Sequence, residues 1–471
     1  MQRPCQIPYD IFDRIQLKGR ENYSMEIAIP PQAAAVLDRL NQSGYEAYLV
    51  GGCVRDSLLG RSPCDWDAAT SARPEETERA LSGFRVIGTG LKHGTVTVLS
   101  AGMPVEVTTY RVDGSYSDGR HPDRVSFTES LEDDLSRRDF TINALAYSPS
   151  SGVVDRFGGV EDLTKKYVRC VGEPDRRFEE DGLRILRALR FSAVLGFAVE
   201  PRTAESLVRN RALLDRIARE RIQVEFTKLI CGRDAAKVLR RFREVFAQFI
   251  PELTPCFGFE QHNPHHNYDV WEHTLHCIDA VEPEPVLRLT MLLHDIAKPE
   301  CFSRDKAGVG HFYGHASKSA EQAKNILTRL RYDRRTVQAV EGLVRLHDLP
   351  MSPEPKVMRT RLNRLGEDQL RMLLKISAAD VKAKAPEEFR RLRALEGCER
   401  ELENILKQKE CFSLDGLAVN GKDLLAIGIT EGPAVGRTLR ALLGAVIDGR
   451  CTNSHTALLQ CAKNLREGKK P

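Results

Sequence analysis

Apolar and polar positions follow a β-rich pattern in the first third of the chain. Residues 31–40 have apolar side chains at helical spacing, and the apolar run 47–50 predicts a buried strand that ends at the Gly51-Gly52 pair. Further on, the short β-branched runs 94–99 and 104–109 are separated by glycine turns. We therefore expect this part of the chain to form a small α/β domain built on a sheet.

The pattern changes beyond about Asp175, where apolar residues recur at helical spacing and no further strands are expected. Segments 179–195, 201–217 and 285–296 each predict a helix, with Gly and Pro between them. The predicted fold class is therefore α+β and multidomain, with a mixed sheet in the N-terminal part followed by all-α regions.

Length and composition limit the classes of protein to which this sequence can belong. A chain of 471 residues exceeds a single hydrophobic core, so several domains are expected. The 70 Lys and Arg against 66 Asp and Glu leave a net charge of +4, so a nucleic-acid surface would have to be a local patch. The 12 cysteines include no Cys-x-x-Cys pair, which favours reduced thiols, and no stretch is apolar for the length a bilayer needs. We expect a soluble, cytoplasmic protein, and Met25 is a second candidate for its natural start.

Residues 49–67 combine an apolar strand, a Gly-Gly turn, a short helix and an acidic strand. A glycine such as Gly52 lets backbone N–H groups approach phosphate oxygens. Asp65 and Asp67 are two positions apart, so on a strand both carboxylates project from one face and can share hard divalent cations. Glu106, in another alternating run, is a candidate third carboxylate. Asp-x-Asp is also common in surface strands and turns, but this combination predicts two-metal phosphoryl transfer.

Residues 178–191 read as one helix, in which Asp181 and Arg184 are three positions apart and share a face. A carboxylate only accepts hydrogen bonds and a guanidinium only donates them, and this pair matches the donor-acceptor edge that cytosine and adenine share. Guanine and uracil present the opposite pattern and would leave unsatisfied groups. Arg187 and Arg190 continue the row. The alternative is an ordinary charged helix face with i,i+3 pairs.

Several motifs together resemble a known family. Gly51-Gly52, Arg55-Asp56 and Asp65-x-Asp67 are similar to the signature of class II tRNA nucleotidyltransferases and bacterial poly(A) polymerases, and residues 137–146 resemble the next motif of that family. The resemblance implies a polymerase-β-like nucleotidyltransferase head in which Asp65 and Asp67 hold two catalytic Mg²⁺ ions. It also implies nucleotide contacts, with Asp181 and Arg184 as an amino-acid template for the incoming base. The residues expected to contact nucleotide are Gly52, Arg55, Arg138, Asp181, Arg184, Arg187 and Arg190.

Other segments extend this resemblance. Residues 111–123 are similar to the family's flexible loop, which enzymes that add the terminal A possess, and residues 417–436 resemble the RNA-binding tail of tRNA nucleotidyltransferases. Ala218 and Phe226 depart from the family pattern, in which Ser and Leu are expected, and this puts local capping and packing in question. In the tail, Lys422, Arg437 and Arg440 are candidates for RNA phosphate contacts. The more common role of such a segment is simply to end one helix and begin the next.

Nine of the twelve histidines fall between His262 and His347. His294-Asp295, with more distant His and Asp partners, resembles the HD phosphohydrolase pattern, in which such residues ligate a divalent metal and activate water on a phosphate. The candidate ligands are His273, His294, Asp295 and Asp348. The same region can also be a degenerate and purely structural HD-like domain, and the sequence leaves both interpretations open.

We therefore expect template-independent addition and repair of the 3′ CCA end of tRNA with CTP and ATP, through contacts to the acceptor and TΨC arms. The alternatives are an A-adding tRNA nucleotidyltransferase, a bacterial poly(A) polymerase, or an HD-domain phosphohydrolase acting on RNA 3′ ends. No membrane partner is expected, and both a monomer and a homodimer remain open. The expected segments are an N-terminal extension (1–27), the head (28–165), a helical neck (166–240), an HD-like body (241–380) and a helical tRNA-binding tail (381–471).

Overall fold

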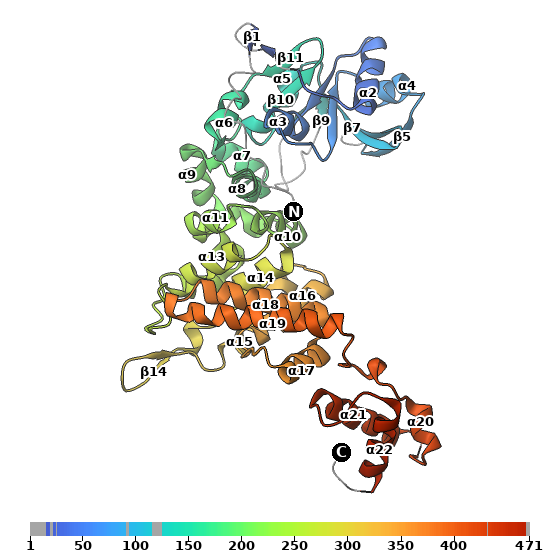
Figure 1. Cartoon of the computed structure of the whole chain (residues 1–471). Coiled ribbons are helices and arrows are strands. Elements are labelled where there is room, and N and C mark those ends of the chain that lie inside the picture. Colours follow the sequence, from blue (N-terminus) through green and yellow to red (C-terminus); the bar gives the residue numbers. More distant parts are fainter. Residues whose placement is uncertain are drawn as a thin grey trace. The chain divides into compact units, whose positions relative to one another are not determined.

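The computed structural model describes residues 16–18, 22–24, 26–90, 94–114, 125–430 and 432–467. The chain divides into two compact units, Met1–Pro251 and Glu252–Pro471. The first unit contains the sheet and the helices α2 to α12, and the second is almost entirely helical (Figure 1). Each unit is described by itself below.

The first unit is organised around a mixed sheet of nine strands in the order β1-β2-β11-β10-β3-β4-β7-β6-β5. Neighbouring strands are antiparallel except β4 and β7, which run parallel. The predicted mixed sheet is therefore confirmed. The strands are β1 (Gln16–Lys18), β2 (Asn22–Ser24), β3 (Ala47–Val50), β4 (Trp66–Thr70), β5 (Arg85–Gly90), β6 (Thr95–Ser100), β7 (Met103–Thr109), β10 (Leu145–Ser148) and β11 (Gly152–Asp155).

Local sequence explains why the first elements form where they do. Helix α2 (Pro31–Gln42) begins with a proline at a position that needs no N–H donor, and it buries Val36, Leu37 and Leu40 at helical spacing. β3 follows as the apolar run predicted for it. The remaining helices of the sheet-bearing part are α3 (Gly52–Leu58), α4 (Pro74–Ala80), α5 (Leu131–Ser136), η2 (Thr141–Asn143) and α6 (Gly159–Lys165), and β8 (Arg111–Asp113) pairs with β9 (Val125–Phe127).

The helices that follow differ from the sequence prediction in two places. The expected single helix over 178–191 is two helices, α7 (Pro174–Glu180) and α8 (Leu183–Leu195), because Asp181 is extended, with φ −148° and ψ 104°. The expected absence of strands is also wrong, since β12 (Tyr167–Val168) pairs with the two-residue β13 (Ala198–Val199). The other elements of this part are α9 (Pro201–Arg209), η3 (Arg211–Arg216), α10 (Arg219–Ile230), α11 (Ala235–Arg241) and α12 (Arg243–Phe249).

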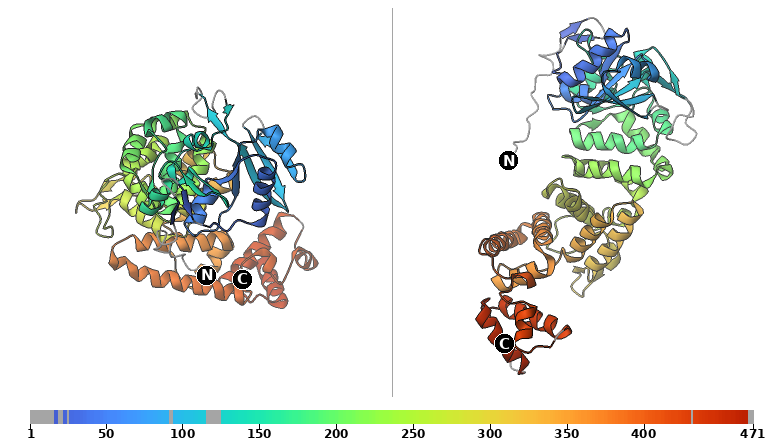
Figure 2. Two further views of the ribbon diagram at one scale, coloured as in Figure 1. Left: turned by 90° about the horizontal axis from the view of Figure 1, so that it is seen from above. Right: turned by 90° about the vertical axis from the view of Figure 1, so that its right-hand side faces the viewer.

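Helices α8 and α10 lie side by side, as the side view in Figure 2 shows. The two departures from the family pattern fall on α10. Ala218 precedes this helix and provides no side-chain cap. Phe226 is fully buried, and its ring lies 5.4 Å from that of Phe249 and 6.0 Å from that of Phe246. The larger aromatic side chain is therefore accommodated by an aromatic cluster.

The second unit contains helices α13 to α22 and one small hairpin of two-residue strands, β14 (Ser303–Arg304) and β15 (Gly310–His311). One apolar cluster includes Met358, Leu374 and Leu402 from α17, α18 and α19, and a separate cluster includes Leu424, Leu442 and Leu458 from α20, α21 and α22. In the described part of the chain, no helix has the length and apolar character required to cross a membrane. The elements are η4 (Pro251–Cys256), α13 (Val270–Ala280), α14 (Pro285–Leu293), η5 (Pro299–Cys301), α15 (His315–Arg329), α16 (Arg334–Leu346), α17 (Pro355–Leu365), α18 (Glu367–Lys382), η6 (Pro386–Phe389), α19 (Arg390–Lys407), η7 (Leu414–Gly416), α20 (Gly421–Ala426), α21 (Pro433–Ile447) and α22 (His455–Arg466).

Candidate active site

The turn between β3 and α3 requires glycine at its first position. Gly51 has φ 78°, a conformation that L side chains rarely adopt, and a Cβ atom there would lie 2.9 Å from Nη1 of Arg138. The adjacent Gly52 is the first residue of α3 and would tolerate a Cβ at ordinary contact distance. The Gly-Gly pair thus lets the chain turn sharply while an arginine from another element lies against its backbone.

Three carboxylates occupy neighbouring positions, two on β4 and β7 and one directly before β4. Asp67 is the second residue of β4 and lies opposite Glu106 of the parallel strand β7. The strand predicted to include Asp65 begins one residue later, at Trp66. Asp65 directly precedes it and is exposed. The sheet register therefore supports the grouping of Glu106 with the Asp65-x-Asp67 pair, which the sequence alone left open.

Among the described residues, burial and the neighbouring carboxylates raise the pKa of Asp67 more than Arg138 lowers it. Burial raises the pKa of Asp67, and the nearby charges of Asp65 and Glu106 raise it further, to about 6, although Arg138 acts in the opposite direction. A carboxylate in this environment gains from any cation placed next to it. Oxygen ligands of this kind suit Mg²⁺, so these residues fit a site for such an ion.

Two of the predicted nucleotide-binding arginines are held by neighbouring side chains. Arg55 is buried, forms two hydrogen bonds of 2.9 Å to Asp56, and donates from Nη1 to Oδ1 of Asn143 over 2.6 Å. Arg138 makes an ion pair of 3.3 Å with Asp134, whose carboxylate also pairs with Arg137. Both arginines are thus fixed beside the turn at Gly51, in positions that do not depend on a ligand.

The structure places Asp181 and Arg184 differently from the expected shared helix face. Asp181 lies in the break between α7 and α8, accepts a hydrogen bond from the backbone N–H of Leu183 and pairs with Arg221 at 2.8 Å. Arg184 lies in the first turn of α8, is 8% exposed, and pairs with Glu180 at 2.6 Å. The two groups are therefore positioned by separate partners, and they do not act as an i,i+3 pair within one helix.

Arg187 and Arg190 continue along α8 and contact buried carboxylates that the sequence analysis did not identify. Arg187 pairs with Asp139 at 2.6 Å, and Arg190 pairs with Glu225 at 2.7 Å while lying 4.0 Å above the ring of Phe191. Burial would raise the pKa of Asp139, but Arg187 lowers it to about 2. Asp139 lies within the 137–146 motif and directly follows Arg137 and Arg138. This adjacency in the sequence is the signal from which a charged partner for the arginines could have been predicted.

Comparison with known proteins agrees with this geometry. Residues 47–169 match the family model of the poly A polymerase head domain. Residues 196–257 match the model described as a probable RNA and SrmB-binding site of polymerase A, and residues 310–462 match that of tRNA nucleotidyltransferase domain 2. The chain is 34% identical over 446 residues to the CCA-adding enzyme of Leuconostoc mesenteroides, covering 93% of this chain and 98% of that protein. It belongs to the CCA-adding enzyme family.

Two further comparisons support membership of the CCA-adding enzyme family. The CCA-adding enzyme of Limosilactobacillus fermentum is 34% identical, with 92% of this chain and 96% of that protein covered. The crystal structure of the Bacillus stearothermophilus CCA-adding enzyme in complex with CTP is 30% identical, with a TM-score of 0.70 over 93% of this chain and 99% of that one. The chain is therefore a tRNA nucleotidyltransferase with the α+β fold of that family.

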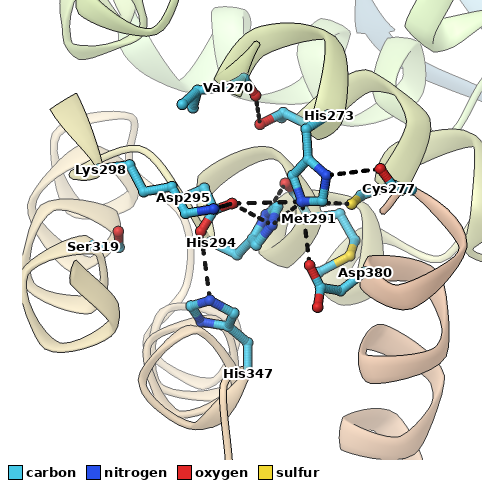
Figure 3. A network of polar contacts seen from close by, with 12 residues as sticks. Val270, His273, Cys277, Met291, His294, Asp295, Lys298, Ser319, His347 and Asp380 are labelled. Atoms are coloured by element: carbon cyan, nitrogen blue, oxygen red, sulfur yellow. Dashed lines mark hydrogen bonds and ion pairs between the residues drawn. The ribbon is translucent and has the colours of Figure 1, made fainter. Parts of the chain in front are cut away.

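This member of the CCA-adding enzyme family also has a buried histidine and aspartate cluster in its second unit (Figure 3). The potential ligand atoms form two groups, and within each group all atoms lie within 4.8 Å of one another. One group comes from His273, Cys277, His294 and Asp380, and the other from Asp295, His315 and His347. All of these residues are buried. The sequence identified three of them as candidate ligands, namely His273, His294 and Asp295.

Asp348, the fourth candidate, does not belong to either group, and Asp380 of α18 takes its place. Helix α16 ends at Leu346, and the ring of His347 turns into the cluster while Asp348 is exposed. Asp348 still lines the pocket of about 360 Å³ next to the cluster. Sequence adjacency to a histidine suggested Asp348, whereas Asp380 lies 33 positions away from His347 and has no such local signal.

Proposed function

We propose that the first unit adds and repairs the 3′-terminal CCA of tRNA, without a nucleic-acid template, using CTP and ATP. The observation that supports this most directly is the group formed by Asp65, Asp67 and Glu106 beside the Gly51 turn, in a chain that matches CCA-adding enzymes over almost its whole length. CTP, ATP and tRNA_CCA are bound in solved structures of CCA-adding enzymes.

Asp65 and Asp67 would hold Mg²⁺, with Glu106 adding a third carboxylate from the neighbouring strand. When bound, the two ions would lower the pKa of the RNA 3′-hydroxyl and neutralise the triphosphate and the departing pyrophosphate. Arg138 lies close enough to Asp67 to influence its pKa and is held by Asp134, so it would contact the nucleotide without reorganisation. Gly52 and Arg55 border the same turn and would orient the phosphates.

The base would be selected by Asp181 and Arg184. A carboxylate that accepts from the amino group and a guanidinium that donates to the ring nitrogen suit both cytosine and adenine. The partners of these residues support the assignment, because Arg221 orients Asp181 and Glu180 orients Arg184 before any base is present. Arg187 and Arg190 lie on α8, as Arg184 does. Their ion pairs with Asp139 and Glu225 would hold α8 in a fixed position.

The direct experiment supplies transcripts of tRNA that end at the discriminator base, at C or at CC, with Mg²⁺ and each nucleoside triphosphate alone or together. We expect C, C and A to be added in order and synthesis to stop. The Asp65→Ala, Asp67→Ala double variant should add nothing, while the matched control Asp38→Ala, which removes an exposed carboxylate from α2, should behave as the parent protein. Continued addition by the double variant would refute the assignment.

The sequence alone left two alternatives for this unit, an A-adding tRNA nucleotidyltransferase and a bacterial poly(A) polymerase, and the same assay distinguishes both from CCA addition. The first would extend only the transcript that ends in CC, and the second would extend unrelated RNAs with A alone. The loop segment 111–123 was predicted to favour terminal A addition, but residues 115–124 lie outside the described residues, so this remains a prediction. The match of residues 310–462 to a tRNA nucleotidyltransferase domain favours tRNA as the partner.

The partner would be recognised through the acceptor and TΨC arms, mostly by shape and phosphate contacts that weaken with salt. Segments 166–240 and 381–471 are the proposed RNA-binding neck and tail, and 241–380 the proposed HD-like body, after the head (28–165) and its extension (1–27). We propose the cytosol as the place of action, and either a monomer or a homodimer as the active form.

A second candidate function rests on the buried cluster in the other unit. His273, His294 and Asp295, together with Asp380, form a set of nitrogen and oxygen donors that suits a divalent transition metal. Such an ion would support hydrolysis of phosphate esters at RNA 3′ ends. Opening of a 2′,3′-cyclic phosphate to a phosphomonoester, or release of inorganic phosphate from a terminal phosphate, with loss of activity in His294→Ala, would establish it.

A further inference from the structure

The aromatic ring of Phe191, on α8, has three guanidinium groups around it. The Cζ atom of Arg190 lies 4.0 Å from the centre of the ring, that of Arg55 lies 5.1 Å away and that of Arg187 5.6 Å. Phe191 is 6% exposed. A cation close to an aromatic ring is attracted by the negative charge of its π face, and the attraction is stronger where water is excluded. One buried side chain thus contacts three of the residues expected to bind the nucleotide.

The three arginines are close enough to repel one another. Burial lowers the pKa of the Arg190 guanidinium, and the positive charges of Arg187 and Arg55 lower it further, whereas Glu225 raises it. Each of the three arginines has a carboxylate partner. The pairs are Arg55 with Asp56, Arg187 with Asp139 and Arg190 with Glu225. The carboxylates offset the charges, and the ring of Phe191 is the surface that all three guanidinium groups share.

A chain of hydrogen bonds also joins Arg55 to Arg187. Nη1 of Arg55 donates to Oδ1 of Asn143 at 2.6 Å, and Nδ2 of Asn143 donates to Oδ1 of Asp139 at 3.1 Å. Oδ2 of Asp139 then accepts from Nε of Arg187 at 2.7 Å. Asn143 and Asp139 are both buried. The ring and this chain of bonds therefore connect α3, which follows the Gly-Gly turn, with α8, which carries the proposed base-selecting arginine.

We propose that Phe191 is a positioning residue for nucleotide binding, whose π face keeps Arg55, Arg187 and Arg190 at fixed separations so that they meet the incoming nucleotide together. Phe191 acts through these arginines and not by touching the nucleotide. Side chains that are held in place before a ligand arrives lose less freedom when it binds, so the ring increases affinity. This inference rests on the proposed function, in which the three arginines contact the nucleotide.

The proposed base-selecting residues are held by separate contacts. Asp181 pairs with Arg221 at 2.8 Å. Arg184 pairs with Glu180 at 2.6 Å. These ion pairs involve neither Phe191 nor the three arginines around it. Weakening the ring should therefore reduce the affinity for CTP and for ATP by the same factor, and it should leave the preference for these nucleotides over UTP and GTP unchanged.

The alternative is that Phe191 only fills the core, and Phe226 of α10 provides the comparison. Phe191 meets Phe140 edge to face, with ring centres 5.8 Å apart and planes at 80°. Phe226 meets Phe249 in the same way, at 5.4 Å and 79°. Both Phe191 and Phe226 are buried, but among the described residues no guanidinium lies over the ring of Phe226. Phe226 is therefore a matched control with the same packing and no cations.

The test varies the charge on the ring at nearly constant shape. Phe191 of the full-length chain is replaced by its mono-, di- and trifluorinated analogues through nonsense suppression, because fluorine withdraws electrons from the π face and adds little volume. The dissociation constants of CTP and ATP are measured by calorimetry with Mg²⁺ and without tRNA. We expect both constants to rise with each fluorine, to about tenfold for the trifluorinated ring. The same series at Phe226 should leave them unchanged.

A second measurement separates affinity from turnover. With CTP on tRNA ending in C, and with ATP on tRNA ending in CC, Phe191→Leu should raise KM by about tenfold and change kcat by less than about threefold. The preference over UTP and GTP should stay as in the parent protein. Phe226→Leu, the matched control, should change none of these values.

Equal responses to fluorine at Phe191 and Phe226, or no response at Phe191, would overturn the positioning role. So would a loss of base preference in Phe191→Leu as large as its loss of affinity. If Phe191→Leu does not fold, the fluorinated series decides, because it preserves the shape of the ring. A parent protein that binds CTP and ATP but adds neither to tRNA would refute the proposed function, and the binding series would still decide the role of Phe191. A parent protein that binds neither nucleotide would refute both.

Discussion

Asp67 on β4 lies directly opposite Glu106 on the parallel strand β7. Burial, together with the negative charges that this register and Asp65 place nearby, raises the pKa of Asp67 to about 6. The same relationship that makes the site suitable for divalent cations is therefore unfavourable for the folded protein without them. This cost can be measured.

Replacing Asp67 by asparagine should stabilise the protein in the absence of divalent metal. A shift from the ordinary value of 3.8 to about 6 corresponds to at most about 3 kcal/mol, and solvent screening of this partly exposed group reduces the expected gain to roughly 1–2 kcal/mol. Chemical denaturation at pH 7.5 with a chelator measures it. The control Asp38→Ala should change the free energy of unfolding by less than about 0.5 kcal/mol. A destabilised Asp67→Asn variant would show that the charge of Asp67 does not lower the free energy of unfolding.

The pH dependence of stability has a defined sign. Between about pH 3.8 and pH 6 the folded state binds more protons at Asp67 than the unfolded state does, so this group's contribution to the free energy of unfolding falls as pH rises through that window. Above pH 6 the repulsion is fully present. Metal binding requires the deprotonated carboxylate, so Mg²⁺-dependent nucleotide addition should rise with pH through about 6. In Glu106→Gln the rise should move to lower pH, and an unchanged midpoint would exclude the coupling.

Arg184→Ala should weaken base selection more than it weakens folding. The guanidinium donates where cytosine and adenine accept, and its loss removes a contact that guanine and uracil cannot make. We expect the preference for CTP and ATP over UTP and GTP to fall at least about tenfold, measured as a ratio of kcat/KM values. Arg176→Ala is the matched control, since Arg176 also pairs with Glu180 but its side chain is 77% exposed. Equal fidelity in both variants would remove the templating role.

Removing Arg187 should destabilise the first unit, because its partner Asp139 is buried and carries a charge. We expect Arg187→Ala to lower the free energy of unfolding by about 2–4 kcal/mol. Adding Asp139→Asn to the same chain should recover part of the loss, since the unpaired charge is then gone. Thermal and chemical unfolding of the two single variants and the double variant gives the coupling energy, and a coupling near zero would contradict the pairing.

Much of the site could be predicted from local sequence because its signals are local. The strand before Gly51 and the Asp65-x-Asp67 spacing both lie within residues 47–67, and the structure places these elements together. The break at Asp181 could not be predicted, because the apolar spacing continues across it and Arg221, the partner of the Asp181 carboxylate, lies 40 positions away. Asp380 is a similar case. It reaches the histidine cluster only through the packing of α18, whereas Asp348 had the stronger local signal.

CCA addition is tested most directly by the 3′ sequence of the product made from one tRNA transcript that ends at the discriminator base, with Mg²⁺ and all four nucleoside triphosphates present. We expect C, C and A to be added in that order, synthesis to stop after three nucleotides, and the Asp65→Ala, Asp67→Ala variant to give no extension. A homopolymeric A tail, an extension containing G or U, or an unchanged product from the double variant would contradict it.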